Sequence, residues 1–334
     1  MSLGSESLQR SLEGLPAGDG AVVGLDVGAT YTSGCLVWPN GTYSNHTVVA
    51  TPPGDRAAVE DVAFKLVRSL VDANETVAVI GIAVAGWVDK SRRTILFSAH
   101  LPWKSEPLAA NLSARLGLPV VMENDANAAT WAERQFGAGQ NFEDFLLVTV
   151  GSGIGAGIVL DGQLIRGAHG LAGELGHAVV DPDGPACPCG RQGCIDSLAS
   201  GRALQRRFGE LRDAADGAGP AADSDAVIPG SEIAAAAERG DPAALQAFAD
   251  VGEALGTGLA DLVMCLDPEA VILAGGVASS GELLRAPTQA ALRRSLSSRD
   301  QFTQIQVLTS SLGREAGSLG VAHLARIHAA SLRG

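Results

Sequence analysis

The chain has 334 residues, which is long enough for two domains that each bury a hydrophobic core. Its net charge is −13 and it contains no basic run, which argues against nucleic acid as a partner, because that binding depends on Lys and Arg side chains. Without an apolar run of roughly 18 residues or a signal peptide, the sequence predicts a cytoplasmic protein with reduced cysteines and no membrane partner.

The N-terminal part of the chain predicts a strand hairpin followed by a helix. Residues 1–20 are polar and glycine-rich, and we expect a disordered tail there. Residues 21–26 have the apolar character of a buried strand, and a glycine turn at 28–30 separates them from a second strand at 33–38. The spacing of apolar side chains in residues 56–72 predicts an amphipathic helix.

Two further strands are predicted next, and the second leads into a polar segment. Residues 77–85 form a continuous apolar run, which is typical of a central strand covered on both faces. Residues 116–122 predict another strand, and Glu123, Asn124 and Asp125 follow it at the start of a helix. Asp125 has two interpretations. It is either a helix N-cap, a position that Asn and Asp favour, or a functional carboxylate at the carboxyl end of a strand, where α/β folds place ligands.

A second strand–glycine–strand hairpin lies near the middle of the chain. Residues 145–150 predict a strand, residues 151–157 contain alternating glycines, and residues 158–160 predict the returning strand. Glycine lets the backbone approach an anion closely, with φ values that other residues resist. Two such hairpins in one chain indicate an internal duplication.

The rest of the chain predicts mostly helices. Residues 213–230 are of low complexity and predict a surface loop. The other expected elements are helices at 202–212, 231–238, 242–266, 281–297 and 317–330, and strands at 270–273 and 305–308.

A short, glycine-punctuated segment holds four metal-ligating side chains. His177, Cys187, Cys189 and Cys194 have the spacing H-x9-C-x-C-x4-C. Three thiolates and one imidazole make a closed tetrahedral Zn²⁺ site, the usual structural arrangement. A disulfide or loose thiols are the alternatives, but three cysteines this close cannot all pair with one another. The spacing therefore favours structural zinc.

The segment from Gly170 to Gly201 resembles the signature of the ROK family (repressors, open reading frames and sugar kinases). That signature reads G-x-x-G-E-x-G-H, then C-x-C-G-x-x-G-C, then a Glu two residues on, and this chain has Asp196 in place of the Glu. Residues 123–129 (ENDANAA) match the family's catalytic segment, and residues 26–30 (DVGAT) stand where its kinases have DIGGT. Tyr31 stands where many of those kinases have Lys. The resemblance extends from about residue 22 to about residue 325.

The resemblance implies a fold and a division into domains. The fold is the two-domain actin-like ATPase (ribonuclease H-like) fold, an α/β fold with duplicated strand–glycine–strand phosphate loops. We expect a smaller α/β domain at residues 21–123, completed by a C-terminal helix at 317–334. A larger α/β domain at 124–316 is expected to carry the zinc site and a dimer surface, since the family suggests a homodimer.

The resemblance also implies an activity, which is ATP-dependent phosphorylation of a hexose, with glucose as the first candidate. Asp125 is expected to act as general base on the attacking sugar hydroxyl. The other expected sugar contacts are Gly86, Asn124, Glu174, His177 and Asp196. Asp26 is expected to organise Mg²⁺, and ATP is expected to lie against Gly28, Thr30, Gly151, Ser152, Gly153, Gly155, Gly275 and Gly276.

Two other functions remain open at this point. A sugar-sensing regulator of the same family could use these domains without catalysis. Ala29 and Tyr31 differ from the residues of the family's kinases and leave that interpretation open. A kinase could also use polyphosphate as donor, and the glycine loops do not decide between the donors.

Overall fold

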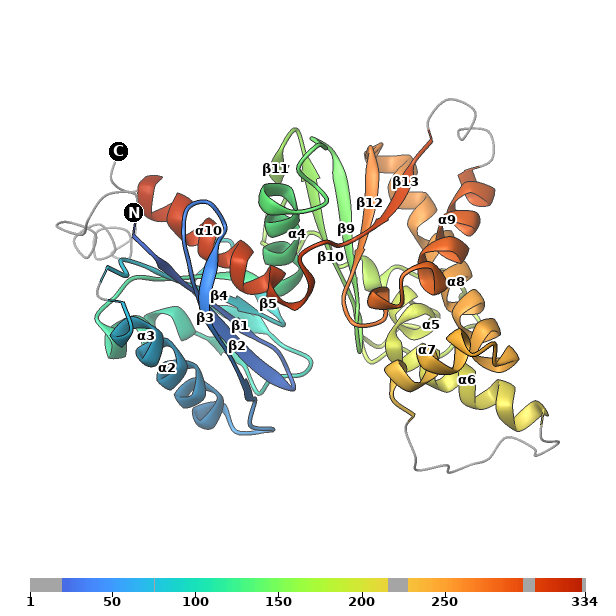
Figure 1. Ribbon diagram of the computed structural model, residues 1–334, viewed down its shortest axis with the longest axis horizontal. Helices are drawn as coiled ribbons and strands as arrows, with labels where there is room; N and C mark the ends of the chain where they lie inside the picture. The colour runs from blue at the N-terminus through green and yellow to red at the C-terminus, as the bar shows by residue number, and fades with distance from the viewer. Residues whose placement is uncertain (1–19, 75, 216–227, 297–303, 332–334) are drawn as a thin grey trace. The chain divides into compact units, whose positions relative to one another are not determined.

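The structure is a computed structural model that describes residues 20–74, 76–215, 228–296 and 304–331. The described residues form two compact units (Figure 1). Unit 1 lies within Met1–Gln140, Leu164–Ala172 and Arg314–Gly334, and unit 2 lies within Asn141–Gln163 and Gly173–Gly313. The predicted tail at residues 1–20 falls outside the described residues, except for Gly20.

Unit 1 is built on a five-stranded mixed sheet with the order β3-β2-β1-β4-β8. Strand β1 pairs with β2 in an antiparallel hairpin and with β4 in parallel, and β4 pairs with β8 in parallel. The strands are β1 (Val22–Val27), β2 (Tyr31–Val37), β3 (Tyr43–Ala50), β4 (Ile80–Val84) and β8 (Val120–Asn124). All residues of β4 are buried, as expected for a central strand that is covered on both faces.

Helices cover both faces of this sheet (Figure 1). Helices α2 (Arg56–Asp72) and α3 (Leu108–Leu116) pack together against one face, while α4 (Asp125–Phe136) and α10 (Ala316–Ser331) pack on the other. A small antiparallel sheet is formed by β5 (Trp87–Val88), β6 (Ile95–Phe97) and β7 (Lys104–Glu106).

Glycines allow α10 to lie directly on the sheet of unit 1. A Cβ atom on Gly24 of β1 would lie 2.0 Å from the backbone oxygen of Ser318, and one on Gly81 of β4 would lie 2.4 Å from that of Val321. Both contacts are with helix backbone, which cannot move aside as a side chain could. The backbone of α10 therefore lies in direct contact with the backbone of β1 and β4 at these two glycines.

Unit 2 repeats the plan of unit 1 with a sheet of order β11-β10-β9-β12-β13. Strand β9 pairs with β10 in an antiparallel hairpin and with β12 in parallel, and β12 pairs with β13 in parallel. The strands are β9 (Phe145–Val150), β10 (Ile154–Leu160), β11 (Gln163–Leu164), β12 (Ala270–Ala274) and β13 (Gln306–Thr309). The two hairpins that the glycine pattern predicted thus occupy equivalent places in two sheets, as a duplication requires.

One long helix, α8 (Pro242–Leu266), organises the helical side of unit 2. It begins as predicted, with Asp241 as N-cap accepting from the backbone N–H of Ala244 at 2.9 Å and Pro242 in the first turn. It packs against α5 (Ile195–Ala199), α6 (Gly201–Ala215), α7 (Gly230–Glu238) and α9 (Glu282–Leu296). Two single-turn helices, η1 (Leu175–His177) and η2 (Ala278–Ser280), complete the described part of unit 2.

Two of the differences between the structure and the sequence predictions concern a strand and a domain boundary. The predicted strand at 116–122 is wrong at its start, because Leu116 ends helix α3 and Gly117 caps it with φ of 71°. Only Val120–Asn124 forms the strand. The predicted domain boundary falls between residues 123 and 124, whereas the two units divide after Gln140, so α4 belongs to unit 1 with the sheet it covers.

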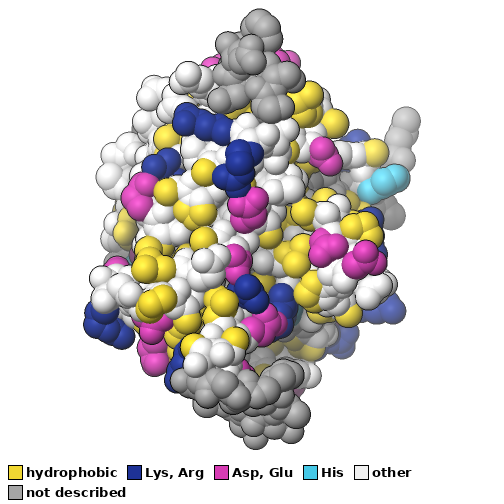
Figure 2. Space-filling model, turned by 90° about the vertical axis from the view of Figure 1, so that its right-hand side faces the viewer, with side chains coloured by type: hydrophobic (Ala, Val, Ile, Leu, Met, Phe, Trp, Pro, Cys, Tyr) yellow, Lys and Arg dark blue, Asp and Glu magenta, His cyan; other side chains and the backbone are white. Residues whose placement is uncertain are grey.

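Acidic and basic side chains lie close to one another on the face drawn in Figure 2. Three ion pairs of the helices of unit 2 have this character: Arg207 with Asp250, Arg285 with Glu282, and Arg294 with Glu253. Such an alternation of charges differs from the single basic stripe of a nucleic-acid site. Among the described residues, no helix is long and apolar enough to cross a membrane.

Candidate functional site

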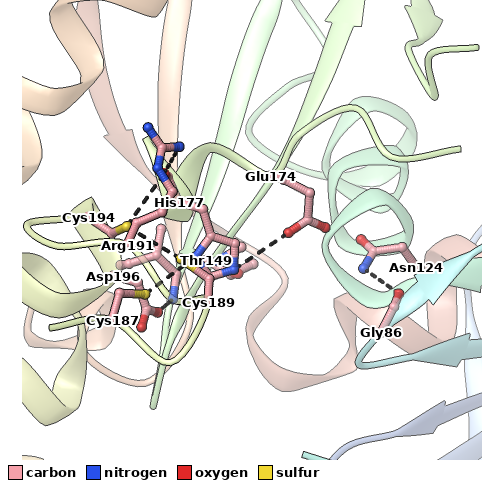
Figure 3. A network of polar contacts seen from close by, with 12 residues as sticks. Gly86, Asn124, Thr149, Glu174, His177, Cys187, Cys189, Arg191, Cys194 and Asp196 are labelled. Atoms are coloured by element: carbon pink, nitrogen blue, oxygen red, sulfur yellow. Dashed lines mark hydrogen bonds and ion pairs between the residues drawn. The ribbon is translucent and has the colours of Figure 1, made fainter. Parts of the chain in front are cut away.

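The predicted catalytic segment spans the end of β8 and the start of α4 in unit 1. Asn124 is the N-cap of α4, and its Oδ1 accepts from the backbone N–H of Asn127 at 3.0 Å. Its Nδ2 donates to the backbone oxygen of Gly86 at 3.1 Å (Figure 3) and to Oδ1 of Asp125 at 3.0 Å. Asp125 is the first residue of the helix, so the interpretation of Asp125 as the cap is wrong. These bonds also occupy Asn124 and Gly86, two of the predicted sugar contacts.

Asp26 lies near the end of β1, and helix α10 approaches it closely. A Cβ atom on Gly317 would lie 2.4 Å from Oδ2 of Asp26, so glycine is required there. Burial, together with the negative charge of Asp125, raises the pKa of Asp26 to about 7. A bound cation would favour the ionised form again, and carboxylate oxygen is the ligand that Mg²⁺ prefers in proteins. Asp26 therefore fits its predicted role as the group that organises Mg²⁺.

The turn between β1 and β2 is held by a buried threonine. The backbone N–H of Gly28 donates to the oxygen of Tyr31 at 3.0 Å and closes the turn. The Thr51 hydroxyl donates to the Gly28 oxygen at 2.8 Å, and the Thr51 N–H donates to the Thr30 oxygen at 2.9 Å. Since the Thr51 proton is used in this way, Thr32 donates to Thr51 across their 2.9 Å contact. The predicted phosphate contacts Gly28 and Thr30 thus lie in a fixed turn.

A buried carboxylate fixes the backbone that enters α4. Glu123 is only 3% exposed, and its Oε2 accepts from Nε of Arg166 at 2.7 Å. Its Oε1 accepts from the backbone N–H of Asn124 and from Nδ2 of Asn127, both at 3.2 Å. Glu123 is thereby bonded on both sides of Asp125 in the sequence, which restricts how far the Asp125 backbone can move.

The second predicted phosphate loop is a shorter turn than the glycine pattern suggested. Gly151 donates from its N–H to the oxygen of Gly153 at 2.9 Å, and this closes the turn between β9 and β10. The prediction of a loop over 151–157 is wrong beyond Gly153, because the following residues pair with β9. Gly155 is opposite Thr149 in the ladder, and its N–H donates to the Thr149 hydroxyl at 3.2 Å. The predicted phosphate contact of Gly155 therefore competes with a bond inside the sheet.

The third glycine segment of unit 2 lies against the same turn. Gly275 has φ of 92°, and a Cβ atom there would lie 2.7 Å from the backbone oxygen of Val150. Val277 donates from its N–H to this oxygen at 2.9 Å. A Cβ on Gly276 would meet open space, and Ser152 is exposed. The two predicted nucleotide-binding segments of unit 2 thus meet at the carboxyl end of β9.

The four predicted zinc ligands come together in unit 2 (Figure 3). Their ligand atoms all lie within 4.8 Å of one another. Nδ1 of His177 is 3.7 Å from Sγ of Cys187, and Sγ of Cys189 is 3.7 Å from Sγ of Cys194.

These separations fit a tetrahedral metal site. Bonds of about 2.3 Å from one Zn²⁺ to two sulfurs at the tetrahedral angle place those sulfurs about 3.8 Å apart. A disulfide would need about 2.05 Å between two sulfurs. Burial and neighbouring thiols raise the pKa of Cys187, and raise that of Cys194 to about 12. A cation would offset the cost of gathering several thiolates, so the donor set and its spacing both suit zinc.

The two ring nitrogens of His177 face different groups. Nδ1 faces the sulfur of Cys187, whereas Nε2 lies 4.0 Å from Oε2 of Glu174 (Figure 3). A histidine whose second nitrogen faces a carboxylate is the usual second layer of a zinc site. Glu174 and His177, both predicted sugar contacts, therefore lie directly beside the cysteine cluster.

Asp196, the remaining predicted sugar contact, is engaged within unit 2. The residue is 7% exposed, and its Oδ1 accepts from the backbone N–H of Ile154 at 2.7 Å. Its Oδ2 lies 3.3 Å from Nη2 of Arg202. These partners direct the carboxylate to the turn between β9 and β10.

The sequence profile of the ROK family matches residues 22–328. The chain belongs to the ROK family. A glucokinase from Streptomyces coelicolor is 38% identical to it over 318 residues, which cover 92% of this chain and 98% of that protein. A xylose repressor from Bacillus subtilis is 29% identical over 92% of this chain and 78% of the repressor, so relatives of both kinds match this ROK protein.

Solved structures agree with the family assignment. The crystal structure of a ROK family glucokinase from Streptomyces griseus, in complex with glucose and AMPPNP, is similar to this ROK protein with a TM-score of 0.84. The identity is 40%, and the match covers 92% of this chain and 100% of that one. ROK sugar kinases have the actin-like ATPase fold. The fold prediction is therefore confirmed, and the two sheets of equal plan are its duplicated halves.

Three residues that hold the candidate site were given no role from the sequence. Thr51 and Arg166 lie in no motif, and each bonds to a segment distant in sequence. Glu123 lies in the ENDANAA match, but the motif assigned it no role. A charged residue at the end of an apolar strand was a usable signal for Glu123, since burial of a carboxylate requires partners. For Thr51 and Arg166 the sequence offers no comparable local signal.

Proposed function

We propose that this ROK protein is an ATP-dependent hexose kinase and that glucose is its first substrate. The observation that carries the proposal lies at the start of α4. Asn124 caps that helix, so the neighbouring Asp125 is not needed as a cap. Asp125 instead lies close enough to Asp26 for its charge to raise the pKa of that buried group. The glucokinase relatives support a kinase function for this chain.

In the proposed reaction, Asp125 accepts the proton of the attacking sugar hydroxyl. The hydroxyl oxygen forms a bond to the terminal phosphorus of ATP as the bond to ADP breaks, and the proton stays on Asp125 until the product leaves. Glu174 and His177 are the proposed contacts to other sugar hydroxyls. In such a reaction most of the rate comes from positioning and from stabilisation of phosphate charge rather than from covalent chemistry.

The proposed nucleotide contacts are backbone groups of the three glycine segments. In unit 1 these are Gly28 and Thr30, with Asp26 as the residue that would hold Mg²⁺ or its waters. In unit 2 they are the turn Gly151–Gly153 and the pair Gly275 and Gly276. Mg²⁺ bound with ATP would supply charge neutralisation of the phosphates.

We also propose that His177, Cys187, Cys189 and Cys194 hold one structural Zn²⁺. Four protein ligands close the tetrahedron, so the ion has no open position for a catalytic water. Its role would be to fix the segment that carries Glu174 and His177. From the family resemblance we further propose a cytoplasmic homodimer, which light scattering on the purified chain would test as twice the mass of one chain.

The experiment measures sugar phosphate formation with glucose, mannose, N-acetylmannosamine, fructose and allose, each with ATP and separately with polyphosphate as donor. With ATP, ADP release is followed as well. We expect turnover with glucose and ATP, and loss of turnover in Asp125→Asn. Glucose binding without sugar phosphate formation would contradict the kinase proposal and favour a sugar-sensing regulator. Phosphorylation of glucose with polyphosphate but not with ATP would show that polyphosphate is the donor.

A further inference from the structure

Asp196 stands where the family signature has a sugar-binding Glu, yet its carboxylate contacts Ile154 and Arg202. It lies in the first turn of α5, two residues after the zinc ligand Cys194. Its Oδ1 accepts from the backbone N–H of Ile154 at 2.7 Å, a short distance typical of a charge-assisted bond. One carboxylate oxygen of Asp196 is therefore bonded to the first residue of β10.

The position of this oxygen is built into the turn that precedes β10. A Cβ atom on Gly153 would lie 2.8 Å from Oδ1 of Asp196, so any larger residue at Gly153 would press on the carboxylate. The other end of the turn is held by the start of α6, since the N–H of Gly201 donates to the Gly151 oxygen at 2.7 Å. The turn Gly151–Gly153 is therefore fastened at both ends by residues 196 and 201.

The segment that fastens the turn is itself attached to the cysteine cluster. Cys194 is the N-cap of α5, and the next residue, Ile195, donates from its N–H to the oxygen of Ala178 at 2.9 Å. On the other side, a Cβ on Gly176 would lie 2.4 Å from the oxygen of Ile154. Ile154 therefore contacts both arms of the metal segment, one beside His177 and one beside Cys194.

Arg202 balances the negative charge that Asp196 brings to a phosphate turn. Its Nη2 lies 3.3 Å from Oδ2 of Asp196, with the Arg202 side chain 47% exposed and that of Asp196 only 9% exposed. An uncompensated carboxylate at this place would repel the phosphates of a nucleotide. The pair is thus suited to supply an acceptor for Ile154 without leaving net negative charge at the turn.

We propose that Asp196 is a positioning residue for the second phosphate turn and that it links the metal segment to nucleotide binding, not to sugar binding. This inference rests on the proposed kinase function. The side chain is one methylene shorter than the Glu of the family signature, and this length lets it reach Ile154 from the first turn of α5.

Four variants test the proposal through separate binding constants for MgAMPPNP and for glucose, measured by calorimetry with the other ligand absent. Asp196→Ala removes the acceptor, and we expect MgAMPPNP to bind at least about tenfold more weakly, the usual effect of losing a bond to a charged group. Asp196→Asn keeps an oxygen acceptor and should remain within about threefold of the wild type. Glucose affinity should change less than about twofold in both, because the two bonds of the Asp196 carboxylate go to Ile154 and Arg202 within unit 2.

The other two variants examine the charge. Arg202→Met leaves the carboxylate uncompensated and should weaken MgAMPPNP while glucose affinity is unchanged. Arg206→Met is the matched control, because Arg206 lies on the same helix and bonds to the Ser197 oxygen at 2.8 Å, not to Asp196. We expect Arg206→Met to bind MgAMPPNP as the wild type does.

A readout without ligand separates this inference from the kinase proposal. Amide hydrogen exchange in residues 151–155 should become faster in Asp196→Ala and stay near the wild-type rate in Asp196→Asn. If the wild type released no ADP, the kinase proposal would fail, but faster exchange would still support the positioning role. Unchanged exchange in Asp196→Ala, or weaker glucose binding with unchanged MgAMPPNP binding, would overturn it and return Asp196 to the sugar.

Discussion

Arg166 donates from Nε to Oε2 of Glu123 at 2.7 Å, and this bond joins residues 43 positions apart in the chain. Glu123 is 3% exposed, and its other oxygen holds the backbone N–H of Asn124. The ion pair therefore reaches the residue that caps α4 and, through it, the backbone of Asp125.

Arg166→Met tests this link. Removing the arginine leaves a buried carboxylate without its cationic partner, so we expect the free energy of unfolding to fall by ~2–4 kcal/mol. The turnover number should fall as well, because the start of α4 loses a constraint. Chemical denaturation and the ADP-release assay measure the two effects.

Arg68→Met is the matched control for Arg166→Met. Arg68 and Asp72 form an ion pair of 2.8 Å in which both side chains are more than half exposed, at 55% and 56%. Exposed pairs of this kind contribute little, about 0.5 kcal/mol or less. An equal loss of stability in both variants would show that burial of Glu123 gives its ion pair no special importance.

Substitution of Asp125 should affect mainly turnover, whereas substitution of its neighbour Asn124 should affect stability. Asp125→Asn keeps the oxygen that Asn124 contacts but removes the basic carboxylate, so turnover should fall about 100-fold or more while glucose still binds. Asn124→Ala removes the helix cap and should cost about 1 kcal/mol of stability. Calorimetry for glucose and thermal unfolding of both variants check this. Retained turnover in Asp125→Asn would contradict the assignment of the base.

Zinc should be measurable in the purified protein. Elemental analysis should find about one Zn per chain, and Cys189→Ser should lower both the metal content and the melting temperature. Cys265→Ser is the control, because Cys265 is a free, exposed cysteine outside the cluster. Absence of metal together with three freely titratable thiols in the native protein would exclude a zinc site.

Local signals explain which parts of the fold were predictable from the sequence. Helix α8 was predictable because an Asp-Pro pair caps and starts it. The two hairpins were predictable because each has a glycine turn between apolar strands. Helix α3 was missed because its N-cap is Pro107, which makes no side-chain cap bond, and the apolar residues after it suggested a longer strand.

The same distinction applies to the candidate site. The cluster of the four proposed zinc ligands was predictable because Cys187, Cys189 and Cys194 lie within one short segment. The Arg166–Glu123 pair and the bond from Thr51 to Gly28 join distant segments, and only folding brings those partners together. Asp196 was identified by its position in a motif, but its partner Ile154 could not be read from the sequence.

The raised pKa of Asp26 predicts a stability cost that depends on pH. An Asp has a pKa of 3.8 when unfolded, and burial beside Asp125 raises it to about 7 in the folded protein. Folding therefore favours the protonated form, so the cost is absent below about pH 4, grows as pH rises, and is complete above about pH 7. Asp26→Asn removes the charge and should raise the free energy of unfolding at pH 8 by ~1–4 kcal/mol.

The measurement is urea denaturation of Asp26→Asn and of the wild type, without Mg²⁺, at several values between pH 4 and pH 8. The gain from Asp26→Asn should be near zero at pH 4 and largest at pH 8, while ADP release is lost because Asn cannot replace the carboxylate at Mg²⁺. A matched change, Asp72→Asn, alters an exposed carboxylate and should show no such rise with pH. A gain for Asp26→Asn that is the same at pH 4 and pH 8 would mean that Asp26 ionises without cost, and that the pair of carboxylates is not held in mutual repulsion.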